Sequence, residues 1–242
     1  MMAVPVARPV PEAVRPATLA LAAGEPVLIF DAADREAETD MVFLSEKATP
    51  EMIRLLRKDA GGLFCTAISD EMRRRLGLPF FTELLEVASA EYPLLGQLGE
   101  RPRYDRRSAF GISINHRENF TGVPDNDRAL TIRTVGEIAR AAPTLSDAEL
   151  KERFRRAFIS PGHVYLIQAA PGLVRERKGH TELVISLARM AGLSESVTVC
   201  EMLGDSGGAR DPDAARRYAE DHGFRFLEGR TIIEAWKAWS SA

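Results

Sequence analysis

The sequence predicts an α/β fold, a three-layer α/β sandwich with a mixed sheet in a single domain. The first observation behind this prediction is that short apolar runs of strand length alternate along the chain with amphipathic stretches of helix length. The second is that no Gly-x-Gly-x-x-Gly follows the first apolar run and that the sequence contains no Walker loop. Dinucleotide-binding and P-loop folds are therefore weak alternatives.

The expected strands are apolar runs that follow turn residues. Val27–Phe30 is the first, because it comes directly after Gly24-Glu25-Pro26. Before it, residues 1–17 contain four prolines and no secretory signal pattern, so we expect a flexible N-terminal arm there and a single domain over residues 18–242. The remaining strands are expected at residues 63–68, 109–115, 164–169, 197–203 and 224–227.

The expected helices begin at capping residues and mostly end at glycines. Thr49 has the pattern of an N-cap with Pro50 in the first turn, and Ser146 with Glu149 has the pattern of a capping box. Residues 81–104 show neither a clear strand pattern nor a clear helix pattern and are expected to be an insertion. Further helices are expected at residues 70–76, 128–140, 181–190, 211–222 and 231–239.

The composition is that of an ordinary globular protein and excludes several classes of function. The 242 residues are 45% apolar, and 32 basic against 35 acidic residues give a net charge of -3. A dedicated nucleic-acid binder carries a basic surface, so nucleic acid is not an expected partner. No apolar run approaches the roughly 20 residues of a membrane span, and two cysteines are too few for a disulfide framework. We therefore expect a cytoplasmic protein without a membrane partner.

An acidic segment follows the first strand. Residues 31–40 contain five carboxylates and one arginine. If the segment is extended, Glu36, Glu38 and Asp40 lie on one face. Carboxylates that are packed together need a cation, a proton or bulk water. A solvated loop is the alternative, but apolar residues on both sides keep the segment near the core, which favours a metal or general-base site.

A basic segment leads into one of the expected helices. It reads Arg175-Glu176-Arg177-Lys178-Gly179-His180-Thr181. Arg177 can bind a phosphate group through two guanidinium nitrogens, and the start of a helix favours anions. The histidine in it is a candidate metal ligand. A basic turn that only caps the helix is an equally weighted alternative.

Three further residues are candidates for chemistry. His163 precedes an expected strand and has a pKa range that suits acid/base catalysis, although isolated histidines are more often structural. Glu201 ends an apolar run, where an unpaired carboxylate is costly and its pKa rises; an exposed strand end is the alternative. Cys65 lies in an expected strand, where an inert core thiol is the more common case. The polar loop 121–128 either caps the next helix or contacts a ligand.

Taken together, these residues indicate a metal-assisted enzyme that acts on a small phosphorylated substrate. Carboxylates with a histidine favour Mg²⁺ or Mn²⁺ over zinc, and Cys200 has no thiol nearby in the sequence that would complete a zinc site.

Four motifs together resemble the 3,4-dihydroxy-2-butanone 4-phosphate synthase family of riboflavin biosynthesis, in its stand-alone form. The resemblance runs from about Leu21 to Trp236, and no cyclohydrolase domain is expected after it. The loop pairs Thr121-Gly122 and Asp127-Arg128 also fit. The four motifs are Asp34-Arg35-Glu36-Ala37-Glu38-Thr39-Asp40-Met41, Ser160-Pro161-Gly162-His163-Val164, Gly179-His180-Thr181-Glu182 and Cys200-Glu201-Met202.

The resemblance implies a lyase that forms homodimers, with its sites near the subunit interface. It implies conversion of D-ribulose 5-phosphate to L-3,4-dihydroxy-2-butanone 4-phosphate and formate with Mg²⁺ or Mn²⁺, and Glu36 and His180 as metal ligands. The implied catalytic residues are His163, Glu201, Glu38, Asp40 and Cys65. The implied substrate contacts are Arg35, Glu36, Asp40, Arg177, Lys178, Gly179, His180, Thr181 and Glu201.

The implied reaction needs several acid/base groups. A base removes the proton on C3 to give an enediol stabilised by the metal, and dehydration, a skeletal shift and loss of formate follow. Which carboxylate is the first base is left open. One departure from the family is Ser206, which stands where a second acid usually follows Asp205. Two other functions remain open: a non-enzymatic module that binds a phosphorylated ligand through Arg177, and another metal-dependent sugar-phosphate isomerase or aldolase.

Overall fold

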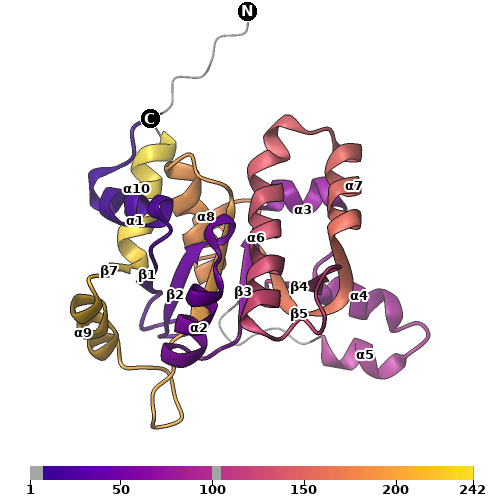
Figure 1. The fold of residues 1–242 in the computed structure, drawn as a ribbon, viewed down its shortest axis with the longest axis horizontal. Coiled ribbons are helices and arrows are strands. Elements are labelled where there is room, and N and C mark those ends of the chain that lie inside the picture. Colours follow the sequence, from indigo (N-terminus) through magenta and orange to yellow (C-terminus); the bar gives the residue numbers. More distant parts are fainter. Residues whose placement is uncertain (1–7, 100–104, 242) are drawn as a thin grey trace, which may run out of the picture.

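A seven-stranded mixed sheet crosses the molecule, in the strand order β4-β5-β3-β6-β2-β1-β7 (Figure 1). The structure, a computed structural model, describes residues 8–99 and 105–241. Two strand pairs are parallel, β1 with β7 and β3 with β5, and the remaining neighbours are antiparallel. The strands are β1 (Val27–Phe30), β2 (Thr39–Leu44), β3 (Cys65–Ile68), β4 (Phe110–His116), β5 (Phe158–Gln168), β6 (Ser196–Glu201) and β7 (Arg225–Glu228).

Helices cover both faces of this sheet and complete three layers. Strand residues alternate between the faces, so that Ile29 packs among α1, α8 and α10, while Leu28 packs among α2, α6 and α9. A third core cluster joins α3 and α7 to α6 over β4 and β5. The predicted three-layer α/β sandwich with a mixed sheet is therefore confirmed. The helices are α1 (Arg15–Ala23), α2 (Pro50–Asp59), α3 (Asp70–Leu76), α4 (Phe81–Ala88), α5 (Pro93–Leu98), α6 (Asp125–Ala141), α7 (Asp147–Ala157), α8 (His180–Met190), α9 (Pro212–His222) and α10 (Gly229–Ser241).

The helix boundaries follow the capping signals. The Thr49 hydroxyl accepts a hydrogen bond from the backbone N–H of Met52, and Ser146 forms the expected capping box with Glu149. Gly77 and Gly223 end their helices in the left-handed conformation, which costs glycine little.

The structure corrects the expected N-terminal arm. Residues 12–14 form a 3-10 turn and α1 begins at Arg15, so the part of the arm from residue 12 to residue 17 packs against the sheet. Val14 is fully buried, and Pro16 lies in the first turn of α1, where its missing N–H breaks no hydrogen bond. Residues 1–7 of the arm lie outside the described residues.

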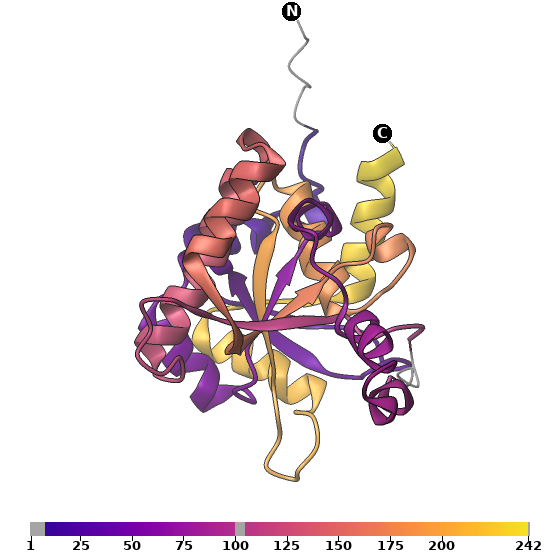
Figure 2. The same ribbon diagram turned by 90° about the vertical axis from the view of Figure 1, so that its right-hand side faces the viewer.

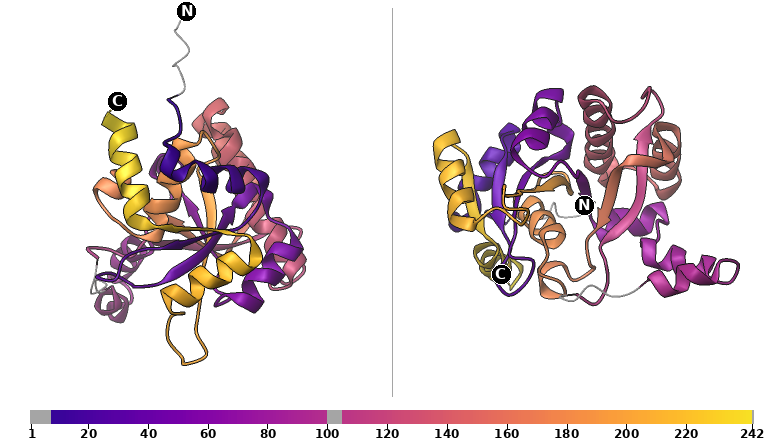
Figure 3. Two further views of the ribbon diagram at one scale, coloured as in Figure 1. Left: turned by 90° about the vertical axis from the view of Figure 1, so that its left-hand side faces the viewer. Right: turned by 90° about the horizontal axis from the view of Figure 1, so that it is seen from below.

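Two other segments differ from the expectation. All six residues of β2 are buried, and the strand pairs with both β1 and β6, although no strand is predicted there from the sequence. Strand β5 begins at Phe158, so His163 lies inside a strand rather than before one. Within the expected insertion, α4 and α5 contain no buried residue and stand apart from the other helices (Figure 3).

The loop that follows β6 projects away from the sheet (Figure 2). It carries Asp205 and Ser206, which are both exposed, and is closed by a bridge between Leu203 and Ala209. Among the described residues, no helix is both long and apolar enough to cross a membrane.

Candidate active site

The ends of several strands and the start of one helix meet at one edge of the sheet. Strand β2 begins beside the end of β6, and the antiparallel register places Asp40 opposite Glu201. Asp40 is also paired with Ile29 of β1, and β3 begins at the same edge with Cys65. Because residues in register project to the same face, the carboxylates of Asp40 and Glu201 lie on one side of the sheet.

A compact turn joins β1 to β2 and fixes the acidic segment. The buried carboxylate of Asp31 accepts hydrogen bonds from the backbone N–H groups of Glu36 and Glu38, both at 3.1 Å. Ala37 takes a positive φ of 56°, and the backbone N–H of Asp31 donates to the carbonyl of Glu38. The segment is therefore not extended, and the turn rather than strand alternation directs Glu36 towards the site.

His180 is the first residue of α8 and faces this turn. Its Nε2 lies 3.1 Å from the carbonyl oxygen of Ile29, to which it can only donate. That contact leaves Nδ1 directed towards Glu36, whose Oε2 is 3.5 Å away. A histidine with one nitrogen held by a carbonyl and the other beside a carboxylate has the arrangement of a metal ligand.

Burial dominates the electrostatics of the cluster. It raises the pKa of Glu38, assisted by Glu36 and Glu201, and it raises the pKa values of Asp40 and Glu201. For His180, burial alone would lower the pKa, but Asp40 and Glu36 outweigh it and raise the pKa to about 9. Buried carboxylates this close together must hold protons or a cation.

The donor set fits a hard divalent cation. Asp31, Glu36 and His180 each offer one ligand atom, and these atoms lie within 4.8 Å of one another. The Oδ1 atom of Asp40 is buried without a hydrogen bond and lies 3.5 Å from Nε2 of His180. Oxygen donors with a single imidazole suit Mg²⁺ or Mn²⁺.

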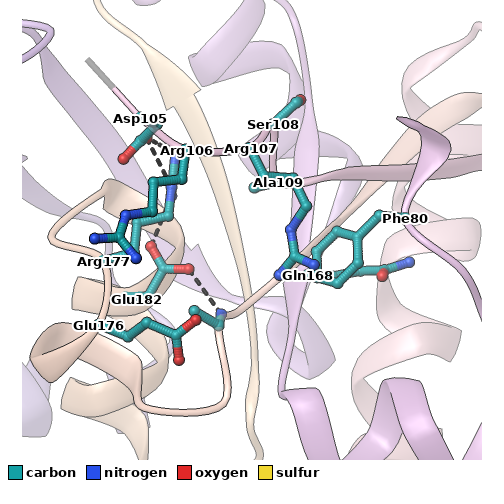
Figure 4. A pocket seen from close by; sticks show the side chains of 11 residues that line it. Phe80, Asp105, Arg106, Arg107, Ser108, Ala109, Gln168, Glu176, Arg177 and Glu182 are labelled. Carbon is teal, nitrogen blue, oxygen red and sulfur yellow. Dashed lines mark hydrogen bonds and ion pairs between the residues drawn. The ribbon is translucent and has the colours of Figure 1, made fainter. Parts of the chain in front are cut away.

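Beside the acidic cluster lies a network of buried ion pairs. Arg35 lies within the turn between β1 and β2, and its guanidinium group contacts Asp31, Glu36 and Asp105. Arg177 contacts the same Asp105, at 2.8 Å from Nε, and reaches Glu182 of α8 at 2.6 Å. The Glu182 carboxylate in turn accepts a hydrogen bond from the backbone N–H of Ala170 (Figure 4).

Two neighbouring cavities open at this edge, with volumes of about 610 Å³ and about 100 Å³. Ser108, Ala109 and Arg177 line both, so the two cavities adjoin at Arg177, which belongs to the network of ion pairs. The smaller cavity is the one that the predicted residues surround. Its walls include Glu36, Asp40, Cys65, Arg177, His180, Thr181 and Glu201.

Most, but not all, of the predicted site residues come together. Gly179 adjoins both arginines, since a Cβ atom there would lie 2.2 Å from Arg177 and 2.8 Å from Arg35. Lys178 is exposed. His163 does not line either cavity of the described chain; its Nδ1 contacts the Asn115 side chain at 3.1 Å, and its backbone N–H donates to the same side chain.

The remaining sequence features have local roles. The loop 121–128 is held by Asp127, whose carboxylate accepts from the backbone N–H groups of Thr121 and Gly122. Burial raises the pKa of the Cys65 thiol well above its ordinary value, so the thiol stays protonated.

The sequence did not predict that Asp105 and Glu182 are partners of the arginines. Glu182 belongs to the motif Gly179-His180-Thr181-Glu182, and only its spacing of five residues from Arg177 indicates the contact. Asp105 lies 72 residues from Arg177 along the chain, so no local signal could have revealed it.

Comparison with known proteins gives one family. Residues 15–235 match the family model of 3,4-dihydroxy-2-butanone 4-phosphate synthase. The enzyme of that name from Methanothermobacter thermautotrophicus is 45% identical over 230 residues, which cover 94% of this chain and 97% of the relative.

Solved structures of the family share the fold. The synthase from Candida albicans aligns with a TM-score of 0.68 and 28% identity, over 91% of this chain and 95% of that one. A synthase in complex with two magnesium ions aligns with a TM-score of 0.72 and 24% identity, over 92% of this chain and 95% of that one. With a family model that spans most of its length and a relative of nearly equal length, the chain belongs to the 3,4-dihydroxy-2-butanone 4-phosphate synthase family.

Proposed function

We propose that this protein converts D-ribulose 5-phosphate to L-3,4-dihydroxy-2-butanone 4-phosphate and formate. The observation that carries the proposal is the convergence of Glu36, Asp40, His180 and Glu201 around one small cavity, beside Arg177. Acid/base groups and an anion-binding arginine are what a sugar phosphate requires. Membership of the synthase family supports the same reaction.

The metal ligands are Glu36 and His180, and the metal is Mg²⁺ or Mn²⁺. When bound, a divalent cation stabilises negative charge that develops on the oxygens of the substrate. Asp31 lies close enough to be a third candidate, but its two oxygens already accept backbone hydrogen bonds from Glu36 and Glu38. Its role is therefore to shape the turn.

Proton transfer falls to the buried carboxylates. Asp40 and Glu201 face each other in register, and burial raises the pKa values of both carboxyl groups, which suits groups that take and return protons. One of them or Glu38 accepts the proton from C3 of the ketose, and a carboxyl group in its protonated form then assists departure of the C1 hydroxyl. The skeletal shift, hydration and release of formate follow.

The other residues of the site bind the substrate or exclude water from the cavity. Arg35, Arg177, Lys178, Gly179 and Thr181 hold the substrate. Cys65 closes the cavity as a neutral thiol, because its pKa is raised by burial.

We also propose that the protein is a homodimer and that His163 of the partner subunit completes the site. The resemblance to the family implies that His163 is a catalytic residue, yet in the single chain it is exposed and held by Asn115. It is flanked on β5 by Ile159 and Tyr165, which are 44% and 37% exposed. Exposed apolar residues around a functional histidine suit a surface that a second copy covers.

A cytoplasmic location without a nucleic-acid or membrane partner completes the proposal. Both cysteines are free and buried, which suits a reducing compartment. The mildly negative net charge argues against nucleic acid.

Formate release tests the reaction. Purified protein with ribulose 5-phosphate and Mg²⁺ should release one formate per substrate consumed, and EDTA should stop the release until excess Mg²⁺ or Mn²⁺ is restored. Glu36→Gln should lower formate release at least 100-fold, whereas the exposed Glu152→Gln should match the wild type.

The alternatives give different results. A sugar-phosphate isomerase conserves five carbons and releases no formate, and an aldolase gives other fragments. A binding module retains the sugar phosphate without turnover and tolerates both Glu36→Ala and His163→Ala. Folded protein that releases no formate would exclude the synthase reaction.

A further inference from the structure

One carboxylate oxygen lies between the two buried arginines of the site. Oδ2 of Asp105 is contacted by Nη2 of Arg35 and by two nitrogens of Arg177, Nε at 2.8 Å and Nη2 at 2.7 Å. All three side chains are largely shielded from water, with exposed fractions of 10% for Asp105, 9% for Arg35 and 16% for Arg177. An oxygen anion shared by two guanidinium groups is the arrangement in which arginines bind phosphate.

The two acidic partners of Arg177 are held in different ways. Glu182 is a fully buried residue of α8, and its second oxygen accepts from the Ala170 N–H. Asp105 lies in the irregular segment before β4, close to Arg177 (Figure 4). Among the described residues, its side chain contacts the two arginines. Glu182 therefore fixes Arg177 in place, whereas Asp105 can leave without disturbing a helix or strand.

The position that Asp105 occupies is open to a ligand. The segment 105–109 and Arg177 line the 610 Å³ cavity, which gives access from solvent. Arg177 also lines the smaller cavity, which contains the acidic cluster. There is no room for a side chain at Gly179, because the two guanidinium groups lie directly against the N-terminus of α8. Anions are favoured at a helix N-terminus.

We propose that Asp105 is an internal competitor of the substrate: its carboxylate holds the place between Arg35 and Arg177 that the phosphate group of ribulose 5-phosphate takes on binding. The inference rests on the proposed function for the identity of the substrate. Asp105 keeps the two arginines paired and close together in the free protein, and the phosphate group displaces it. The affinity for the sugar phosphate is thereby set below what the arginines alone would give.

The expected effect follows from the competition. A ligand binds only the molecules in which Asp105 has left, so the apparent dissociation constant is the intrinsic one divided by that fraction. If Asp105 stays bound in about nine molecules of ten, its removal tightens binding about tenfold. The opposite role, in which Asp105 positions the arginines for the substrate, predicts weaker binding after its removal.

Titration with inorganic phosphate separates these roles. In calorimetric titrations of the Mg²⁺-free protein, Asp105→Asn and Asp105→Ala should bind phosphate about tenfold more tightly than the wild type. Arg177→Gln should abolish that binding, which shows that the titration reports this site. Asp147→Asn, which removes an exposed carboxylate paired with Arg75, is the matched control and should leave the dissociation constant unchanged.

Enzyme kinetics provide the second measurement. The KM for ribulose 5-phosphate should fall about tenfold in Asp105→Asn, with kcat within a factor of two of the wild type. Unchanged or weaker phosphate binding in both Asp105 variants would overturn the proposal, as would binding that survives Arg177→Gln. The two proposals fail separately, because absence of formate release in the wild type refutes the reaction while the phosphate titration still decides the role of Asp105.

Discussion

At the scale of single residues, the absence of a side chain at position 179 is what lets the anion site form. A Cβ atom on Gly179 would lie 2.2 Å from Nη1 of Arg177 and 2.8 Å from Nη2 of Arg35, well inside van der Waals contact. The φ angle of -82° is ordinary, so the requirement for glycine is steric and has nothing to do with backbone strain.

Gly179→Ala should therefore weaken substrate binding. The methyl group has to push both guanidinium groups aside, and we expect the KM for ribulose 5-phosphate to rise at least tenfold with a smaller change in kcat. Steady-state formate assays measure both constants. Gly208→Ala is the matched control, because a Cβ atom there meets no atom within 4 Å. Equal kinetics in the two variants would contradict the steric argument.

At the scale of elements, α6 is packed against the turn that follows β2. A Cβ atom on Gly136 of α6 would lie 2.1 Å from the backbone nitrogen of Glu46, in the 3-10 turn Ser45–Lys47. That neighbour is backbone and cannot rotate away. The same turn continues the strand that carries Asp40, so the contact between helix and turn also supports the site.

Gly136→Ala should lower the stability of the fold. Alanine gains about 1 kcal/mol over glycine in a helix interior, but overpacking against fixed backbone costs about 1–3 kcal/mol, and a contact this short lies at the upper end. We expect the free energy of unfolding to fall by about 1–2 kcal/mol. Urea denaturation monitored by circular dichroism checks this, with Gly208→Ala as the reference. A more stable variant would mean that the helix propensity outweighs the clash.

The elements that the sequence predicted are those with local signals. Thr49 and Ser146 mark helix starts through their own side chains, and Gly77 marks a helix end through its φ angle. Strand β2 lacked such a signal, because it begins with the polar pair Thr39-Asp40 and is buried on both faces, which removes the alternation expected of a strand.

The candidate site divides in the same way. Residues of the acidic turn and of the start of α8 were predicted because they are close together in the chain. The contact between Asp105 and Arg177 depends on how the segment before β4 packs against the loop before α8, and such long-range packing leaves no pattern in one sequence. The position of His163 away from the cavity likewise depends on the path of β5.

At the scale of the whole molecule, the buried acidic cluster links stability to pH and metal. Asp40 has a pKa of about 8 against an ordinary 3.8, and His180 has a pKa of about 9 against 6.5. At a pH between the ordinary pKa of each group and its pKa in the folded protein, the folded protein holds more protons than the unfolded chain. The free energy of unfolding therefore falls as pH rises. The contribution of Asp40 is lost from about pH 4 to 8 and that of His180 from about pH 6.5 to 9.

A divalent cation should oppose the loss of stability at high pH. It competes with the protons for the same groups, so it binds more tightly when those protons have left. We expect the rise in Tm caused by 10 mM MgCl₂, relative to EDTA, to be larger at pH 8.5 than at pH 5.5. Thermal melts at the two pH values measure it, and Glu36→Gln should reduce the rise at both. A rise in Tm that is equal or smaller at pH 8.5 would show that the cluster is not where the cation binds.

The proposed dimer makes a prediction about mixed subunits. If His163 acts in the cavity of the partner subunit, a heterodimer of His163→Ala and Glu36→Gln subunits has one site with both defects and one site with none. Unfolding and refolding the two inactive variants together, in equal amounts, should then restore about a quarter of the wild-type formate release, since half of the dimers are mixed. Glu36 and Glu201 line the same cavity, so refolding Glu36→Gln with Glu201→Gln should restore none. Failure of the first mixture to recover activity, with dimers confirmed by light scattering, would mean that His163 serves the cavity of its own chain through a rearrangement of β5.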